Sequence, residues 1–182
     1  VNYWCVLSLL HFFKESEMKI YKVEEVDTHG GSLRVYATMN KNKRVHKSLN
    51  KYIQLEKKNK LDKIETYYKF ARDIKKIKSN SLKKIKKIIS EDKKIIAYGA
   101  PAKATTVLNY FGLDLNDIEF TIDDNPLKQE KYIPGTGIQI KSVENFEYSK
   151  VDYILVLAWN FFEQIKKTNQ KLFPESKFIK LK

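Results

Sequence analysis

The chain has 182 residues, of which 42% are hydrophobic, and this is enough for one substantial core plus an appendage. Its formal net charge of +13 would suit nucleic acid or another acidic partner, but its basic residues are almost all lysines. Because base-edge and bidentate phosphate contacts favour arginine, we expect no nucleic-acid site. A single cysteine argues against a disulfide framework and suits a cytoplasmic protein, and no apolar run is long enough to span a bilayer, so no membrane partner is expected.

Residues 1–40 are predicted to form one helix and one pair of strands. The helix is expected over residues 4–14, and the strands over 19–26 and 33–38, around the turn at 29–31. Two strands and one helix cannot bury a core by themselves. We therefore expect this part to expose a strand edge and to be less stable than residues 94–182.

Residues 41–92 are predicted to be a helical bridge. Apolar residues recur at helical spacing from Ile64 to Ile89, with one interruption at Lys78, and lysines occupy the opposite face. This pattern is typical of a helix that packs on a neighbouring domain and keeps its basic face in water. A helix lying on a membrane surface would share it.

Residues 93–182 alternate between apolar strands and helices. Strands are expected near 94–98, 117–122, 151–157 and 177–181, and helices near 101–111 and 161–172. Alternation of this kind implies parallel pairing with right-handed crossovers, and therefore a Rossmann-like α/β fold. The loop 123–142 holds two prolines and two glycines and is expected to line a site.

The turn between the first of these strands and its helix suggests an anion site. Gly99 permits the turn, and Pro101 suits the first helical position. Ala100 is a poor N-cap, and Lys103 places a positive charge where the helix dipole disfavours it. A bound phosphate would resolve both features. The alternative is an ordinary turn with a solvated lysine.

Polar residues also follow the next strands. Asn125 and Asn160 lie at strand ends, on the sheet edge where open α/β sheets bind ligands, although capping is their ordinary role. Lys128 could neutralise a pyrophosphate or simply contact solvent. Trp159 could stack on a ligand ring or close the edge of the core. His11 and His46 have no metal-ligating neighbours at suitable spacing, so no metal is expected.

Three motifs in order resemble a known family. They are Gly-Ala-Pro-Ala-Lys at 99–103, Asp-x-Asn-Pro-Leu-Lys-Gln at 123–129, and a strand ending in Trp-Asn at 159–160. This order resembles the C-terminal domain of SAM-dependent sugar C-methyltransferases, and residues 3–9 and 28–34 resemble the end of that family's SAM-binding domain. The resemblance implies a remnant of the SAM-binding domain over 1–40, a bridge over 41–92 and the C-terminal domain over 93–182.

The resemblance also implies what the chain does. Family members use SAM to methylate a carbon beside the ketone of a nucleotide-linked 4-keto deoxysugar. The substrate-binding residues that it implies are His29, Gly30, Gly31, Ser32, Gly99, Ala100, Lys103, Asn125, Lys128, Trp159 and Asn160. The chain departs from the family pattern at Glu130, Gly137 and Gln139, and these changes leave the exact sugar open.

Several family features are missing from this sequence. It lacks the cysteines of the family's zinc domain, the glycine-rich SAM loop and the Glu-His pair that would supply the base. We therefore expect a fragment with no catalytic residue, no metal and no cofactor of its own, inactive without the missing upstream domains. Two alternatives stay open, namely a nucleotide-binding α/β module without chemistry and a basic adaptor for nucleic acid or another acidic partner.

Overall fold

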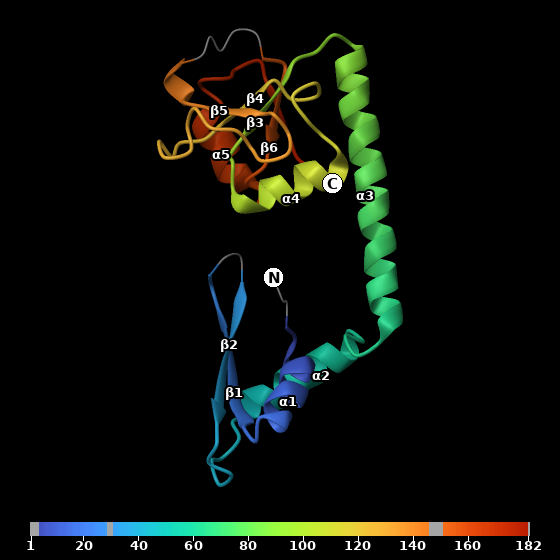
Figure 1. The fold of residues 1–182 in the computed structure, drawn as a ribbon, viewed down its shortest axis with the longest axis vertical. Coiled ribbons are helices and arrows are strands. Elements are labelled where there is room, and N and C mark those ends of the chain that lie inside the picture. The colour runs from blue at the N-terminus through green and yellow to red at the C-terminus, as the bar shows by residue number, and fades with distance from the viewer. Residues whose placement is uncertain (1–3, 29–30, 146–150, 182) are drawn as a thin grey trace. The chain divides into compact units, whose positions relative to one another are not determined.

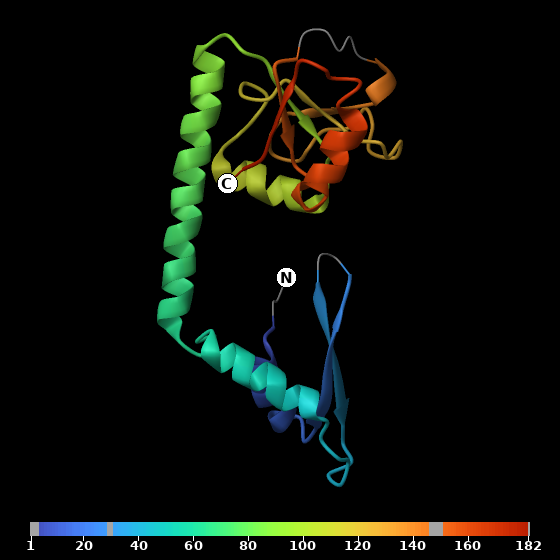
Figure 2. The same ribbon diagram turned by 180° about the vertical axis from the view of Figure 1, so that it is seen from behind.

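The chain divides into two compact units, Val1–Asp73 and Ile74–Lys182 (Figure 1). The computed structural model describes residues 4–28, 31–145 and 151–181. The division falls inside α3 (Ile64–Ser90), which is one continuous helix (Figure 2).

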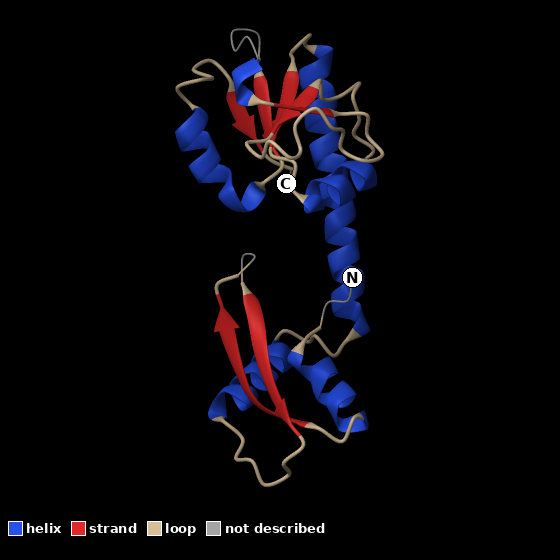
Figure 3. Ribbon diagram, turned by 60° about the vertical axis from the view of Figure 1, so that its left-hand side comes forward, coloured by secondary structure: helices blue, strands red, loops and turns tan. Residues whose placement is uncertain are grey.

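The first unit is built on an antiparallel hairpin with two helices against it (Figure 3). Its elements are α1 (Val6–Glu15), β1 (Lys19–Val26), β2 (Ser32–Thr38) and α2 (Lys47–Lys58). The predicted helix and both predicted strands are confirmed. Their shared core consists of Val6, Ile20, Val23 and Leu49, so α2 supplies apolar surface that the hairpin and α1 lack. The buried carboxylate of Glu56 accepts the N–H groups of Val6 and Leu7, at 2.7 and 2.8 Å, and so caps α1.

We expect amide hydrogens to exchange faster in this hairpin than in the second unit. In the described part of the chain, β2 pairs only with β1, whereas β6 (Tyr153–Val156) lies between two strands of a larger sheet. An edge strand opens more readily than a central one. Hydrogen exchange followed by mass spectrometry should show amides of Leu33–Thr38 exchanging about tenfold or more faster than those of β6. Equal protection of the two strands would contradict this expectation.

The second unit is a Rossmann-like α/β domain, as predicted, and its parallel sheet has five strands where the sequence predicted four. Its elements are β3 (Ile95–Tyr98), α4 (Ala102–Phe111), β4 (Phe120–Ile122), β5 (Gln139–Lys141), β6, α5 (Phe162–Asn169) and β7 (Lys177–Ile179). The strand order is β5-β4-β3-β6-β7, and every pair in it is parallel. The chain thus builds outward from β3 on one side and then crosses to β6 on the other. The sheet has its topological switch point between β3 and β6.

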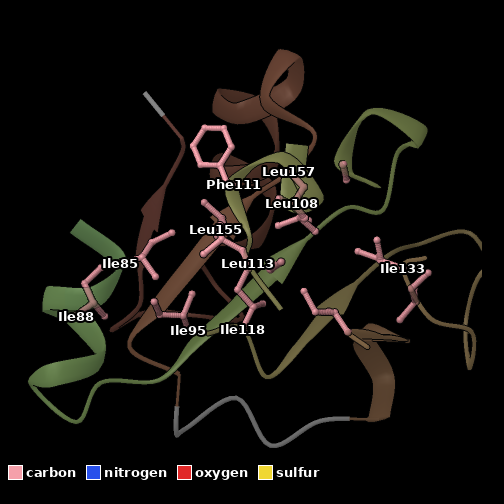
Figure 4. Packing of buried hydrophobic residues seen from close by; sticks show 14 residues of the cluster. Ile85, Ile88, Ile95, Leu108, Phe111, Leu113, Ile118, Ile133, Leu155 and Leu157 are labelled. Carbon is pink, nitrogen blue, oxygen red and sulfur yellow. The ribbon is translucent and has the colours of Figure 1, made fainter. Parts of the chain in front are cut away.

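The C-terminal half of α3 packs on this sheet. Ile85 and Ile88 lie in one buried cluster with Ile95, Leu108 and Leu155 (Figure 4). Lys78 of the same helix interrupts the apolar stripe for a structural reason. Its ammonium group lies 4.7 Å from the ring centroid of Tyr110 and donates a hydrogen bond to the carbonyl oxygen of that residue, near the end of α4.

The predicted loop 123–142 contains a strand that the sequence analysis missed. β5 pairs with β4, and the preceding segment folds back on it, because Ile140 donates to the carbonyl oxygen of Lys131 and Glu130 donates to that of Ile140. Only three residues of β5 are in strand geometry, and this is too short for an alternating pattern to be visible.

Candidate functional site

The turn after β3 brings two parts of the sheet edge into close contact. Gly99 has φ +88°, and its N–H donates to the carbonyl oxygen of Ile122 at 2.6 Å. A Cβ atom built on Gly99 would lie 3.0 Å from the Cβ of Ala158, which follows β6. Glycine is therefore required both for the backbone conformation and for the close approach at the switch point.

The carboxylate of Asp123 holds this turn in place. It accepts the N–H of Ala100 at 2.7 Å, the N–H of Asn125 at 3.0 Å and the ammonium of Lys128 at 3.1 Å, and Asp123 is only 8% exposed. Burial raises the pKa of Asp123, but these three donors outweigh burial and hold that pKa below its ordinary value.

The sequence analysis did not predict this role of Asp123. The carboxylate accepts the N–H of Ala100, so this N–H is not available to an external anion. Lys128 is likewise paired with Asp123, so part of its charge is already compensated. The motif at 123–129 therefore stabilises the turn after β3, because its Asp123 and Lys128 side chains already bond within the protein.

The start of α4 retains the features of an anion site. Pro101 is the N-cap, so α4 starts one residue later than predicted, and no side-chain hydrogen bond from the described residues caps the helix. The first two helical residues, Ala102 and Lys103, are both exposed. The Lys103 ammonium lies 5.1 Å from the ring centroid of Trp159, which comes from the turn after β6. The fold thus brings together two residues predicted from separate motifs.

A hollow of about 450 Å³ opens beside the same turn. Residues at the ends of β3, β4 and β6 form one side, and α5 forms the other. The lining residues are Tyr98, Gly99, Asp123, Asp124, Asn125, Ala158, Phe161, Gln164, Ile165, Thr168 and Asn169. Inside it, the Tyr98 hydroxyl donates to both carboxylate oxygens of Asp124, at 2.9 and 3.1 Å. Parallel sheets place ligand sites in this position.

The family comparison agrees with the order of these motifs. A family model described as the C-methyltransferase C-terminal domain matches residues 27–180, which is most of the chain. The chain belongs to this family. The resemblance found in the sequence motifs is confirmed by the match.

A curated relative of this chain is a longer protein. The C-methyltransferase NovU of Streptomyces niveus is 30% identical to this chain over 176 residues. The match covers 96% of this chain but 42% of NovU. The chain therefore spans less than half the length of this relative.

The domain gathers most of the predicted site residues at one sheet edge. Gly99, Ala100, Lys103, Asn125 and Trp159 surround the switch point. Asn160 follows Trp159 in a short 3₁₀ turn with an exposed side chain. As substrate contacts, all of these residues stay predictions.

Other predicted residues lie in the first unit or outside the described residues. Gly31 has φ +106° and precedes β2, and the Ser32 hydroxyl donates to the carbonyl oxygen of Thr28 at 3.1 Å. The predictions for His29 and Gly30 fall outside the described residues. Among residues 4–28, 31–145 and 151–181, there is no group of three or more His, Cys, Asp or Glu that could bind a metal, and no helix is long and apolar enough to cross a bilayer.

The sequence analysis predicted only two of the eleven residues that line the hollow, Gly99 and Asn125. Asp123 and Asp124 stand in a quoted motif, but they read as turn formers beside Asn125. The sequence predicts Tyr98 as the last residue of a buried strand and Phe161 as the first residue of a helix, so neither was expected to line a site. Two adjacent carboxylates at the end of the second strand were the available signal, because parallel strands deliver such groups to the edge that binds ligands.

Proposed function

We propose that this chain is the C-terminal part of a SAM-dependent C-methyltransferase that acts on a nucleotide-linked 4-keto deoxysugar. In this proposal the second unit binds the nucleotide sugar at the C-terminal edge of its sheet. Residues 1–40 are proposed to complete the sheet of an upstream SAM-binding domain. The family match and the name of NovU support methyl transfer to carbon.

The binding proposal rests on two contacts at the switch point. Gly99 lies close to Ala158, and the Lys103 ammonium lies over the ring of Trp159. Exposed residues at a helix start can donate their N–H groups to a phosphate oxygen, and the helix dipole favours negative charge there. The Lys103 ammonium adds a charge-assisted donor beside these groups. The Trp159 ring holds that ammonium near the helix start through a cation–π contact worth about 0.5–1 kcal/mol at exposed sites.

The described residues do not fit a SAM site of their own. The turn after β3 has one glycine, followed directly by Ala100 and Pro101, and the N–H of Ala100 is already bonded to Asp123. The backbone therefore cannot wrap a cofactor as a glycine-rich loop does. In the proposal, the upstream domain binds SAM and this chain presents the sugar to it.

Lys103→Glu should weaken nucleotide-sugar binding by on the order of 1–3 kcal/mol, the scale of a charge-assisted contact. Folding should change little, because a carboxylate suits a helix N-terminus, although the contact with Trp159 is lost. Isothermal titration calorimetry of the 182-residue chain with UDP-glucose would measure the change.

The matched control is Lys171→Glu, which makes the same change in net charge at an exposed position after α5. If both variants bind as the unmodified chain does, with folding confirmed by circular dichroism, Lys103 is a solvated surface residue and the phosphate site is refuted. A preference for ADP over UDP-glucose would favour the alternative of a nucleotide-binding module without chemistry.

A further inference from the structure

The hollow beside Gly99 contains a carboxylate that phosphate binding does not use. Asp124 is exposed, and its two oxygens both accept the hydroxyl of Tyr98, which is only 6% exposed. Burial and the hydrogen bond to Asp124 raise the pKa of Tyr98 to about 12. The hydroxyl therefore remains a donor at neutral pH and keeps the carboxylate in one orientation.

The walls of the hollow suit a ring that carries hydroxyl groups. The Phe161 ring is 59% exposed, although it lines the hollow, and Ile165 adds an aliphatic surface. Gln164 and Thr168 supply polar groups from the same helix. A volume of about 450 Å³ lies within the range of small-molecule sites, and apolar walls with a few fixed polar groups are their usual composition.

The charges at this edge also give the ligand a direction. Asp123 is compensated by Lys128 and two backbone N–H groups. The Asp124 oxygens accept the neutral hydroxyl of Tyr98, and no lysine or arginine among the described residues forms a salt bridge with them. A carboxylate without a paired cation repels phosphate and attracts hydroxyl donors. The phosphate end of a ligand should therefore face Lys103, and its hydroxyl-bearing ring should face Asp124.

We propose that Asp124 accepts a hydrogen bond from a pentose hydroxyl of the bound nucleotide, and that Tyr98 positions Asp124 for this bond. The inference rests on the proposed nucleotide-sugar site and identifies its pentose subsite. The position agrees with the general geometry of doubly wound sheets, in which a carboxylate near the end of the second strand meets the ribose hydroxyls. Here that strand is β4, and Asp124 follows it by two residues.

Titration calorimetry with UDP, 2′-deoxy-UDP and 3′-deoxy-UDP tests this bond. The unmodified chain should bind UDP about tenfold or more tightly than the analogue that lacks the bonded hydroxyl, as expected for a hydrogen bond to a charged group. Asp124→Ala should bind all three ligands with equal affinity, and Asp124→Asn, which keeps the side-chain volume, should show a reduced preference. Glu175→Ala, at an exposed position before β7, is the control and should keep the full preference.

The outcomes separate this inference from the proposal on which it rests. If UDP binds in a Lys103-dependent manner, but the hydroxyl preference is the same with and without Asp124, the pentose subsite is refuted and the phosphate site stands. If the unmodified chain binds neither UDP nor inorganic pyrophosphate, both are refuted. Tyr98→Phe keeps the ring and removes the hydroxyl, so an undiminished preference in this variant would refute the positioning role of Tyr98.

Discussion

Asp123→Asn should lower the free energy of unfolding of the second unit by about 2–3 kcal/mol. The carboxylate accepts two backbone N–H groups and an ammonium through its two oxygens, and it is almost fully buried. An amide has only one oxygen, so its NH₂ group must face at least one of these donors. Chemical denaturation followed by circular dichroism would measure the loss.

The neighbouring carboxylate provides a matched control. Asp124→Asn makes the same chemical change one residue along, at an exposed side chain whose oxygens accept the Tyr98 hydroxyl, and an amide oxygen can still accept that hydroxyl. Its cost should stay below about 1 kcal/mol. Equal losses in the two variants would contradict the structural role assigned to Asp123.

The same carboxylate should make stability depend on pH. Because the pKa of Asp123 is lower in the folded chain than its ordinary value, the unfolded chain binds its proton first. The stabilisation is therefore complete above about pH 4 and is lost as the pH falls below that value. Denaturation curves between about pH 3 and pH 6 should show a steeper loss in the unmodified chain than in Asp123→Asn.

Gly99→Ala should destabilise the second unit by about 2–4 kcal/mol, through two separate costs. A side chain at φ +88° strains the backbone, and the new Cβ would lie 3.0 Å from the Cβ of Ala158. Gly99 and Ala158 each lie in a turn that follows a buried strand, so neither residue can move freely to relieve the contact. Thermal unfolding would register the change as a lower midpoint.

Gly112→Ala separates the two costs. Gly112 ends α4 with φ +73°, but a Cβ there would meet nothing within 4 Å. This variant should cost only the backbone strain, about 1–2 kcal/mol. If Gly99→Ala costs no more than Gly112→Ala, the close approach of the two turns does not constrain the fold, and the account of the switch point is wrong.

Much of the second unit's fold was predictable because its central strands are apolar. The strands β3 and β6 are bounded by polar or turn-forming residues, and this combination identifies buried parallel strands. β5 was not predictable in this way, since three residues carry no periodicity and the strand depends on pairing with β4. The N-terminal half of α3 differs for another reason. Ile64 and Tyr68 belong to its apolar stripe but are exposed, because periodicity indicates a face without showing what covers it.

Part of the site was predictable because some of its residues do not suit the local secondary structure in which they lie. Lys103 beside an uncapped helix start conflicts with local helix rules, and the fold brings it next to Trp159. The missed features depend on contacts between distant residues. The bond from Ala100 to Asp123 joins residues 23 apart, and the bond from Tyr98 to Asp124 joins residues 26 apart. Neither pair has a local pattern that shows it.

Amide chemical shifts during a titration with UDP-glucose test the central claim most directly. The claim is that a nucleotide sugar binds the C-terminal edge of the sheet at its switch point. In ¹H–¹⁵N spectra of the full chain, we predict the largest shifts at Gly99, Ala102, Lys103, Asn125 and Asn160, with amides of β2 unchanged. Saturating ligand that leaves these amides unmoved, or that shifts another surface instead, would contradict the account.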